Sequence, residues 1–447
     1  MRISANRSQL TWSPVLGWVL LACATSAAQA QTETSSPAAQ ILLEQAPVID
    51  IPDVPVSVTG AFNAPGEVGI AIGAFTLYPS IEVQAGYDSN VYATSAPTVG
   101  SPYTLIRPVV ELKSDWLNHS FRITAGAGVG IYANASTQNY WNGFVQMDGR
   151  LDIREDFYAT GLVAVRRQTE ALGTPNALVA TSPTVVDTIP VEVGLYQRFN
   201  RFFYDFKAAA TRYNYTDNSI VSSGGLPAAS RNRMEYDERV RLGYEVADGL
   251  DVWVAPGLNQ RIYDQFVNAF GQQRDSTGWN VNFGATFKLT TKSILEGYVG
   301  YSTQTYIADG TTTPAFTFGL SGSWNGYDPL TIRPSFIRTI NESPYSNYTN
   351  YVSTVLGIDF TYDIHDAWQM VGGTGINIAD FTPAPGSGAG PRTDYYWRAS
   401  LGLLYALRPQ IQLGPLYEHT TGWSTNVPAG GPSYTREVIS LRLVARR

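Results

Sequence analysis

Apolar and polar residues alternate with a period of two along most of the chain from Phe75 onward. Between Phe121 and Ile131 every odd-numbered residue is apolar, whereas the even-numbered residues are arginine, threonine or glycine. Between Met234 and Val246 the even-numbered residues are apolar or aromatic, with Glu238 and no other as an exception. Because successive side chains of a β-strand point to opposite faces, this pattern predicts strands with one apolar and one polar face.

The pattern recurs about every twenty residues, between stretches rich in glycine, proline, asparagine, aspartate and serine. It predicts about eighteen strands, with a range of 16 to 20 because strand boundaries are poorly defined by sequence. The predicted strands are 76–92, 103–114, 119–133, 139–153, 157–171, 188–199, 202–216, 233–247, 250–264, 275–290, 293–308, 314–326, 329–341, 349–363, 367–381, 394–407, 410–423 and 434–446.

The connections between these strands alternate between short and long. Asn200 to Arg201 and Asp248 to Gly249 are short, whereas Gly173 to Asp187 and Asp217 to Asn232 are long. An even number of antiparallel strands with tight turns at one end and longer loops at the other is typical of an outer-membrane barrel. We therefore predict an all-β, up-and-down transmembrane barrel in the bacterial outer membrane, with both termini in the periplasm.

Closure into a ring explains how strands can cross lipid, since every backbone polar group then finds a partner and no edge stays open. The apolar faces would contact lipid and the polar faces would line water. A soluble β-sandwich or propeller also alternates, but its strands are typically about five or six residues, shorter than the segments here. After residue 30 no apolar run is long enough for a helical membrane span.

The N-terminal part differs from the rest. Residues 1–30 have the features of a signal peptide, namely Arg2 and Arg7, an apolar stretch and a small-x-small cleavage site at Ala28 to Ala30. Residues 31–74 form an acidic, proline-rich periplasmic linker, and residues 75–447 form the barrel. An alternative is a lipoprotein box in which Cys23, the only cysteine, is acylated.

Composition excludes several classes of protein. The net charge is −7, charged residues make up 15% of the chain, and no basic tract is present, so we expect no nucleic-acid partner. A hydrophobic content of 44% excludes disorder over the whole chain.

Residues 69–83 and the following Gly86-Tyr87-Asp88-Ser89-Asn90 resemble the entry into the β-barrel porin family of the second type. Arg107-Pro108 and Ser114-Asp115-Trp116 resemble that family's second strand and first tight turn. The resemblance implies an outer-membrane barrel that is often associated with export of surface or extracellular polysaccharide. The partners that it implies are outer-membrane lipid, the barrel-assembly machinery, periplasmic polysaccharide-export components and a polysaccharide. The chain departs from ordinary outer-membrane proteins in ending with Arg446-Arg447 and not with an aromatic residue.

Charged residues on the predicted inward faces are candidates for the pore lining, because charged rings in a pore select which solutes pass. These candidates are Arg166, Lys207, Arg233, Glu235, Asp237, Arg239, Arg241, Arg261 and Arg398. Inward aromatic residues are candidates for stacking on sugar rings. They are Tyr132, Tyr196, Trp253, Tyr263 and Tyr298. Simple hydration of the wall and ordinary lumen tyrosines are the alternative interpretations.

An outer-membrane enzyme acting on lipid is a further alternative, with His419, Glu418 and Thr420 as its candidate residues. No nucleophile motif accompanies them, so we expect a conduit without catalysis. Asp88-Ser89-Asn90 offers oxygen ligands but lacks the glycine and distal glutamate of a calcium loop, which favours an Asx turn. We predict no metal and no cofactor. A general or nutrient-uptake porin is the alternative to polysaccharide export.

Overall fold

The computed structural model describes residues 69–178, 182–216, 224–268, 270–290, 292–425 and 431–447. The predicted signal peptide, Cys23 and nearly all of the predicted linker lie outside these residues. The described part contains no helix that is long and apolar enough to cross a membrane.

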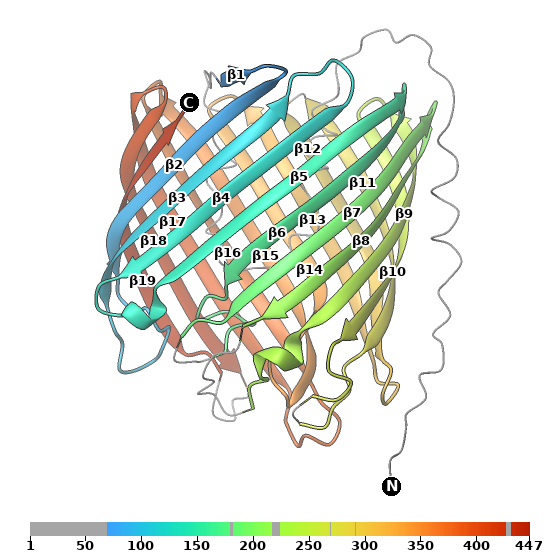
Figure 1. Cartoon of the computed structure of the whole chain (residues 1–447), viewed down its shortest axis with the longest axis vertical. Coiled ribbons are helices and arrows are strands. Elements are labelled where there is room, and N and C mark those ends of the chain that lie inside the picture. The colour runs from blue at the N-terminus through green and yellow to red at the C-terminus, as the bar shows by residue number, and fades with distance from the viewer. Residues whose placement is uncertain (1–68, 179–181, 217–223, 269, 291, 426–430) are drawn as a thin grey trace. The chain divides into compact units, whose positions relative to one another are not determined.

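Eighteen antiparallel strands, β2 to β19, form a closed barrel (Figure 1). Each strand pairs with the next along the chain, and β19 pairs with β2 to close the ring, for example through Leu443 opposite Val83. The strands are β2 Phe75–Asp88, β3 Ser101–Ser114, β4 Ser120–Tyr132, β5 Tyr140–Arg154, β6 Phe157–Thr169, β7 Val185–Phe199, β8 Phe202–Tyr215, β9 Arg233–Ala247, β10 Leu250–Tyr263, β11 Ser276–Thr290, β12 Ser293–Tyr306, β13 Thr312–Tyr327, β14 Leu330–Glu342, β15 Tyr348–His365, β16 Trp368–Pro383, β17 Arg392–Arg408, β18 Ile411–Thr425 and β19 Tyr434–Arg446.

The prediction of an eighteen-strand transmembrane barrel is confirmed, and each predicted strand overlaps one of these. The sequence pattern missed a short strand, β1 (Ile70–Ile72), which pairs with the start of β2 in a hairpin. Gly73 makes this turn with a φ of 64°, a left-handed conformation that glycine adopts without strain.

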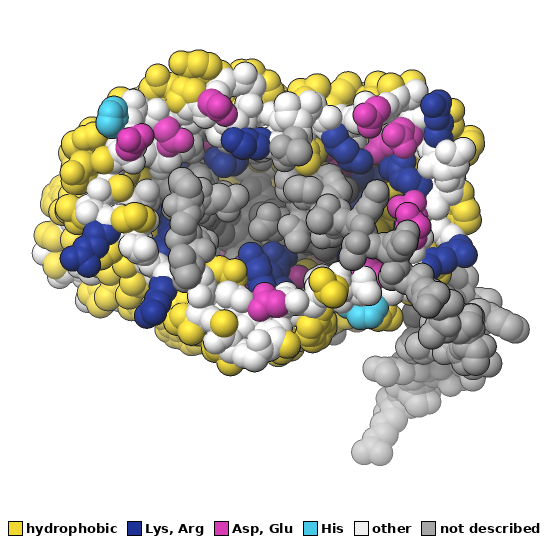
Figure 2. Space-filling model, turned by 90° about the horizontal axis from the view of Figure 1, so that it is seen from above, with side chains coloured by type: hydrophobic (Ala, Val, Ile, Leu, Met, Phe, Trp, Pro, Cys, Tyr) yellow, Lys and Arg dark blue, Asp and Glu magenta, His cyan; other side chains and the backbone are white. Residues whose placement is uncertain are grey.

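The two faces of the strands differ as the alternation predicts. Val193 in β7 and Val299 in β12 lie on the outer face and are 54% and 52% exposed. Glu192 and Glu296, on the opposite faces of the same strands, form ion pairs with the inward side chains of Lys207 and Arg241. Seen from the end with the short turns, the barrel has hydrophobic side chains around its outside and charged side chains around its opening (Figure 2).

Several aromatic residues lie near the short turns in the sequence, and in outer-membrane barrels such rings usually lie on the outer face at the membrane interface. Phe199, Phe202 and Trp368 agree with this, since all three are exposed on the outer face. Tyr158 and Phe203 do not, because both rings lie on the inner wall, where they flank Tyr196. Tyr158 and Phe203 are the second residues of β6 and β8, and the first residue of each strand points outward. Because successive side chains of a strand alternate between faces, Tyr158 and Phe203 point inward.

Candidate functional site: the lumen

The inward face of β9 carries the charged ladder that the sequence predicted. Arg233 donates from Nε to Glu235 at 2.7 Å, and Arg241 donates both terminal nitrogens to Glu296 of β12 at 2.9 Å. Asp237 and Arg239, in the middle of the ladder, form no ion pair with any described residue. The ladder therefore has paired charges at its two ends and an acid and a base without close partners between them.

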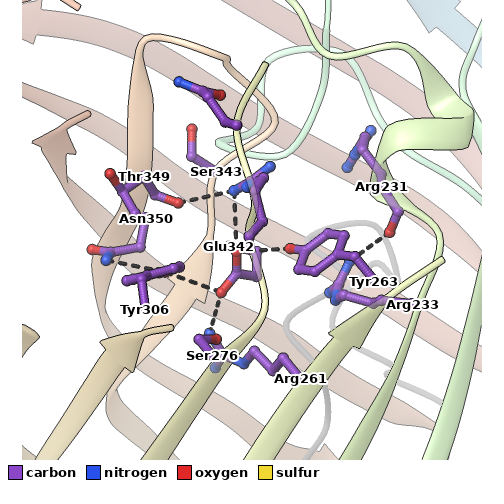
Figure 3. A network of polar contacts seen from close by, with 12 residues as sticks. Arg231, Arg233, Arg261, Tyr263, Ser276, Tyr306, Glu342, Ser343, Thr349 and Asn350 are labelled. Carbon is purple, nitrogen blue, oxygen red and sulfur yellow. Dashed lines mark hydrogen bonds and ion pairs between the residues drawn. The ribbon is translucent and has the colours of Figure 1, made fainter. Parts of the chain in front are cut away.

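A buried carboxylate, Glu342 at the end of β14, collects four donors near the long-loop end of the lumen (Figure 3). Arg261 and Tyr263, both on β10, donate to it at 2.6 Å and 2.7 Å. Arg274 and Tyr306 donate at 3.0 Å and 3.1 Å. Two cations and two hydroxyls offset the cost of burying one carboxylate, which would be several kcal/mol if it were unpaired.

A second buried ion pair joins two of the long loops. Arg231, at the end of the short helix η4 (Ala228–Arg231), donates two hydrogen bonds to Glu170 at 2.6 and 2.9 Å. Its guanidinium also lies 4.0 Å from the centre of the Tyr215 ring. Burial alone would lower the pKa of Arg231, but Glu170 and Tyr215 raise it above its ordinary value, so Arg231 keeps its positive charge.

The loop that follows Glu170 crosses the lumen. Asn176 accepts a hydrogen bond from Tyr351 of β15 at 2.7 Å, and the carbonyl of Gly173 accepts one from Tyr434 of β19 at 2.7 Å. The loop starts at the end of β6, and β15 is the ninth strand from β6 in the ring of eighteen. Residues 170–178 therefore connect the end of β6 with side chains of β15 and β19 and occupy part of the lumen.

Five aromatic rings lie along the inner wall from β6 to β12. Tyr158 stacks on Tyr196 at 4.7 Å, and Tyr196 stacks on Phe203 at 5.9 Å. Phe203 and Trp253 belong to one buried cluster, and Trp253 lies 6.2 Å from Tyr298. We call these five rings the aromatic strip.

Three of the predicted sugar-stacking residues, Tyr196, Trp253 and Tyr298, thus lie together in the strip. Arg241 covers one face of Trp253 with its guanidinium, 4.0 Å from the ring centre. The other two predicted residues lie elsewhere: Tyr132 faces Tyr103, with ring centres 6.0 Å apart, and Tyr263 binds Glu342. The stacking role of these residues stays a prediction.

The remaining pore-lining candidates occupy separate parts of the inner wall. Arg166 donates to Gln146 at 2.8 Å, and Arg398 donates to Glu418 at 2.5 Å. Lys207 pairs with Glu192 at 3.1 Å, whereas Arg261 belongs to the cluster around Glu342. Their part in selectivity also stays a prediction.

The candidate enzyme residues do not converge. Glu418 and Thr420 lie on the opposite face of β18 from His419, since neighbours along a strand alternate between faces, and Glu418 pairs with Arg398. His419 faces outward, where its Nδ1 lies 2.7 Å from Glu437 and its ring lies 5.0 Å from Trp397. The proposed trio of His419, Glu418 and Thr420 is therefore wrong as a single site.

Asp88 and Asn90 form the expected Asx turn, in which the backbone N–H of Asn90 donates to Asp88 at 2.9 Å. The Asp88 carboxylate also accepts hydrogen bonds from Arg436 at 2.6 Å to 3.1 Å. Within the described ranges, no three His, Cys, Asp or Glu side chains gather in a way that would hold a metal ion.

Sequence reasoning missed Glu342, Arg274, Tyr306 and the Glu170–Arg231 pair. Glu342 follows Phe336 and Ile340 on the face that alternation assigns to lipid, so its position predicted the wrong side. Arg274, Arg231 and Glu170 lie just outside the strands, where the period of two carries no information.

The fold and the lined interior define a porin-like outer-membrane barrel. Residues 64–447 match the family described as "Putative beta-barrel porin 2", and the chain belongs to this family. No curated protein matches the chain.

Several solved structures are similar in part. OccAB3 of Acinetobacter baumannii has 11% identity and a TM-score of 0.42, with 83% of this chain and 99% of that chain covered. The outer membrane protein opdK of Pseudomonas aeruginosa has 10% identity and a TM-score of 0.44, with 83% and 98% covered. The copper transporter OprC has 9% identity and a TM-score of 0.44, with 85% and 81% covered.

Proposed function

We propose that the protein is an aqueous conduit across the outer membrane, without catalytic activity, and that its short-turn end and both termini face the periplasm. The observation that carries this proposal is the separation of the two faces. The outer face is apolar and the inner face carries ion pairs such as Arg241–Glu296 and Lys207–Glu192. A hydrated, mixed-charge wall lowers the cost of moving a polar solute through the hydrocarbon layer.

The cargo that we propose is a surface or extracellular polysaccharide moving outward. The family resemblance implies this association. Of the aromatic strip, Tyr158, Tyr196 and Tyr298 are partly exposed and would contact sugars, whereas Phe203 and Trp253 are only 8% and 6% exposed and support them from behind. The strip starts at Tyr158 and Phe203, next to the short turns, which is the end where a periplasmic polymer would enter. Periplasmic export components are the corresponding partners.

Uptake of a small nutrient is the second candidate. The loop of residues 170–178 favours it, because a segment held in the lumen by the contacts of Glu170 with Arg231 and of Asn176 with Tyr351 limits the size of a solute. A polymer would have to pass beside this loop or displace it. The two candidates therefore differ in whether the loop must move.

Planar-bilayer recording with the purified chain tests the conduit. We expect stepwise currents at neutral pH, and oligosaccharides added on the short-turn side should block them transiently if the aromatic strip binds sugars. Absence of current, also after removal of residues 31–68, would reject the conduit.

Deletion of the gene in the source bacterium separates export from uptake. Export predicts that surface polysaccharide is lost and that the polymer or its precursors remain behind the outer membrane. Unchanged polymer output together with slower growth on one carbon source would instead support uptake.

A further inference from the structure

One stretch of the inner wall, from β9 to β12 beside the aromatic strip, carries polar side chains that have few partners within the protein. The side chains of Asp237, Arg239, Asn259 and Ser302 form no hydrogen bond or ion pair with any residue that the structure describes. We call this stretch the polar patch. Its members are Asp237, Arg239, Asn259, Asn280, Asn282 and Ser302.

The polar patch faces the lumen. Its members alternate along their strands with outward residues such as Leu258 and Phe283, which are 61% and 59% exposed. Asp237 is itself exposed, and the other five members are half-buried. Because these side chains lie on the inner face, they are open to the water of the lumen.

The register of the strands places the members of the patch in neighbouring rows. Arg239 of β9 lies in one row with Asn280 of β11 and Ser302 of β12. In the next row toward the long loops, Asp237 lies opposite Asn259 of β10. Since neighbouring strands are about 4.8 Å apart, Arg239 and Ser302 are separated by about 14 Å across the wall. The patch is therefore long enough for a ligand of several connected units.

Glycines between these residues let the amide side chains lie against the wall. An added Cβ at Gly257 would lie 3.0 Å from both Nδ2 and Oδ1 of Asn280. An added Cβ at Gly300 would lie 2.1 Å from Oδ1 of Asn282. Each amide thus lies over the backbone of the neighbouring strand, which leaves room for a ligand in front of it.

Tyr298 of β12 borders the patch at the end of the aromatic strip. Its ring lies over Gly319 of β13, where an added Cβ would lie 2.2 Å from it, and Trp253 lies 6.2 Å away. The ring is half-buried, and Arg239 is near enough for its charge to act on the Tyr298 hydroxyl. A partly exposed ring beside polar groups is a surface on which a sugar ring can stack.

The charges of the patch favour an uncharged ligand. Asp237 and Arg239 are two residues apart on one face of β9, a separation of about 7 Å. An anion that Arg239 attracts is repelled by Asp237, and a cation that Asp237 attracts is repelled by Arg239. A hydroxyl both donates and accepts hydrogen bonds, so the hydroxyls of one neutral ligand can satisfy the carboxylate, the guanidinium and the amides together.

We propose that the polar patch and Tyr298 form a binding site for neutral sugar units. One sugar ring stacks on Tyr298, and hydroxyls of the same chain of sugars bind Asp237, Arg239 and the amides. This inference rests on the proposed conduit, whose cargo it narrows to a neutral saccharide, and it holds for export as well as for uptake. Binding itself requires no transport.

Calorimetric titration of the purified, folded protein in detergent tests the site without any current. The neutral probes are maltohexaose, cellohexaose and mannohexaose, and the acidic probe is hexagalacturonate. We expect at least one neutral probe to bind and hexagalacturonate not to bind. Tyr298→Ala should weaken binding of that neutral probe roughly tenfold, because it removes the stacking surface. The matched control is Tyr103→Ala, a half-buried inner-wall tyrosine of β3, the ninth strand from β12 in the ring.

Asp237→Asn tests the role of the charges, because it removes the acid and keeps the shape of the side chain. Arg239 is then the only charge of the patch, so hexagalacturonate should begin to bind while the neutral probe still binds. Asp264→Asn, on the outer face, should change neither. Heat-dependent gel migration shows that each variant is folded, and Asn280→Ala replaces Tyr298→Ala if the latter fails to fold.

Failure of every neutral probe to bind would overturn the proposal, as would equal binding of hexagalacturonate by the unmodified protein. Equal affinities of Tyr298→Ala and Tyr103→Ala for the neutral probe would also overturn it. If bilayers show current but no neutral probe binds, the conduit stands and the sugar site fails. If the probes bind as expected and no current is seen, the conduit fails and the site stands.

Discussion

Glycine residues decide where the aromatic strip lies on the inner wall. The ring of Trp253 covers Gly284 so closely that a Cβ on Gly284 would lie 2.3 Å from the ring and 2.7 Å from the carbonyl oxygen of Gly297. The ring of Phe203 covers Gly243 in the same way, at 2.0 Å. Each glycine thus lets a large ring lie flat against the wall, where it fills little of the lumen.

This packing predicts the effect of one methyl group. Gly284→Ala should push Trp253 off the wall and destabilise the barrel by roughly 1–3 kcal/mol, the usual cost of overpacking. Gly128→Ala is the matched control, since it lies on the inner face of β4 and an added Cβ would meet only Arg107 at 3.8 Å. Urea unfolding of the barrel in lipid vesicles, followed by tryptophan fluorescence, measures both, and equal stability of the two variants would contradict the packing argument.

At the scale of elements, the wall was predictable and the contents of the lumen were not. Each strand repeats the period of two over ten or more residues, so the ends of segments such as 233–247 and 250–264 could be read within about one residue of β9 and β10. The pairing of Glu170 with Arg231 joins two separate loops, and no local pattern encodes it. The cluster around Glu342 was missed for a related reason: the alternation of β14 places Glu342 on the same face as Phe336 and Ile340, which predicts the lipid side.

The loop of residues 170–178 should depend on its anchor. Glu170→Gln leaves the buried Arg231 without its charged partner, and we expect the anchoring to weaken by roughly 3 kcal/mol, as for other broken buried pairs. Faster amide exchange of residues 170–178 and noisier single-channel current would show this.

The control for this prediction is Asp264→Asn. Asp264 pairs with Arg212 on the outer face, and the hydrogen bond from Arg212 lowers the pKa of Asp264. This pair is largely exposed, so its loss should cost under about 1 kcal/mol. If the amide exchange rates of residues 170–178 are the same in Glu170→Gln, in Asp264→Asn and in the unmodified protein, the loop is held by other contacts.

For the whole molecule, one face of each strand meets lipid and the other meets the lumen. An arginine should therefore affect the stability of the barrel differently on the two faces of one strand. Val299 lies near the middle of β12, is 52% exposed and points outward, whereas Ser302 in the same strand points inward. Val299→Arg places a cation near the bilayer midplane and should destabilise the barrel by about 2–4 kcal/mol. Ser302→Arg places it in the lumen, where water can solvate the charge, so stability should change little. Reversible unfolding in vesicles compares the two variants, and the opposite ranking would mean that the apolar faces do not face lipid.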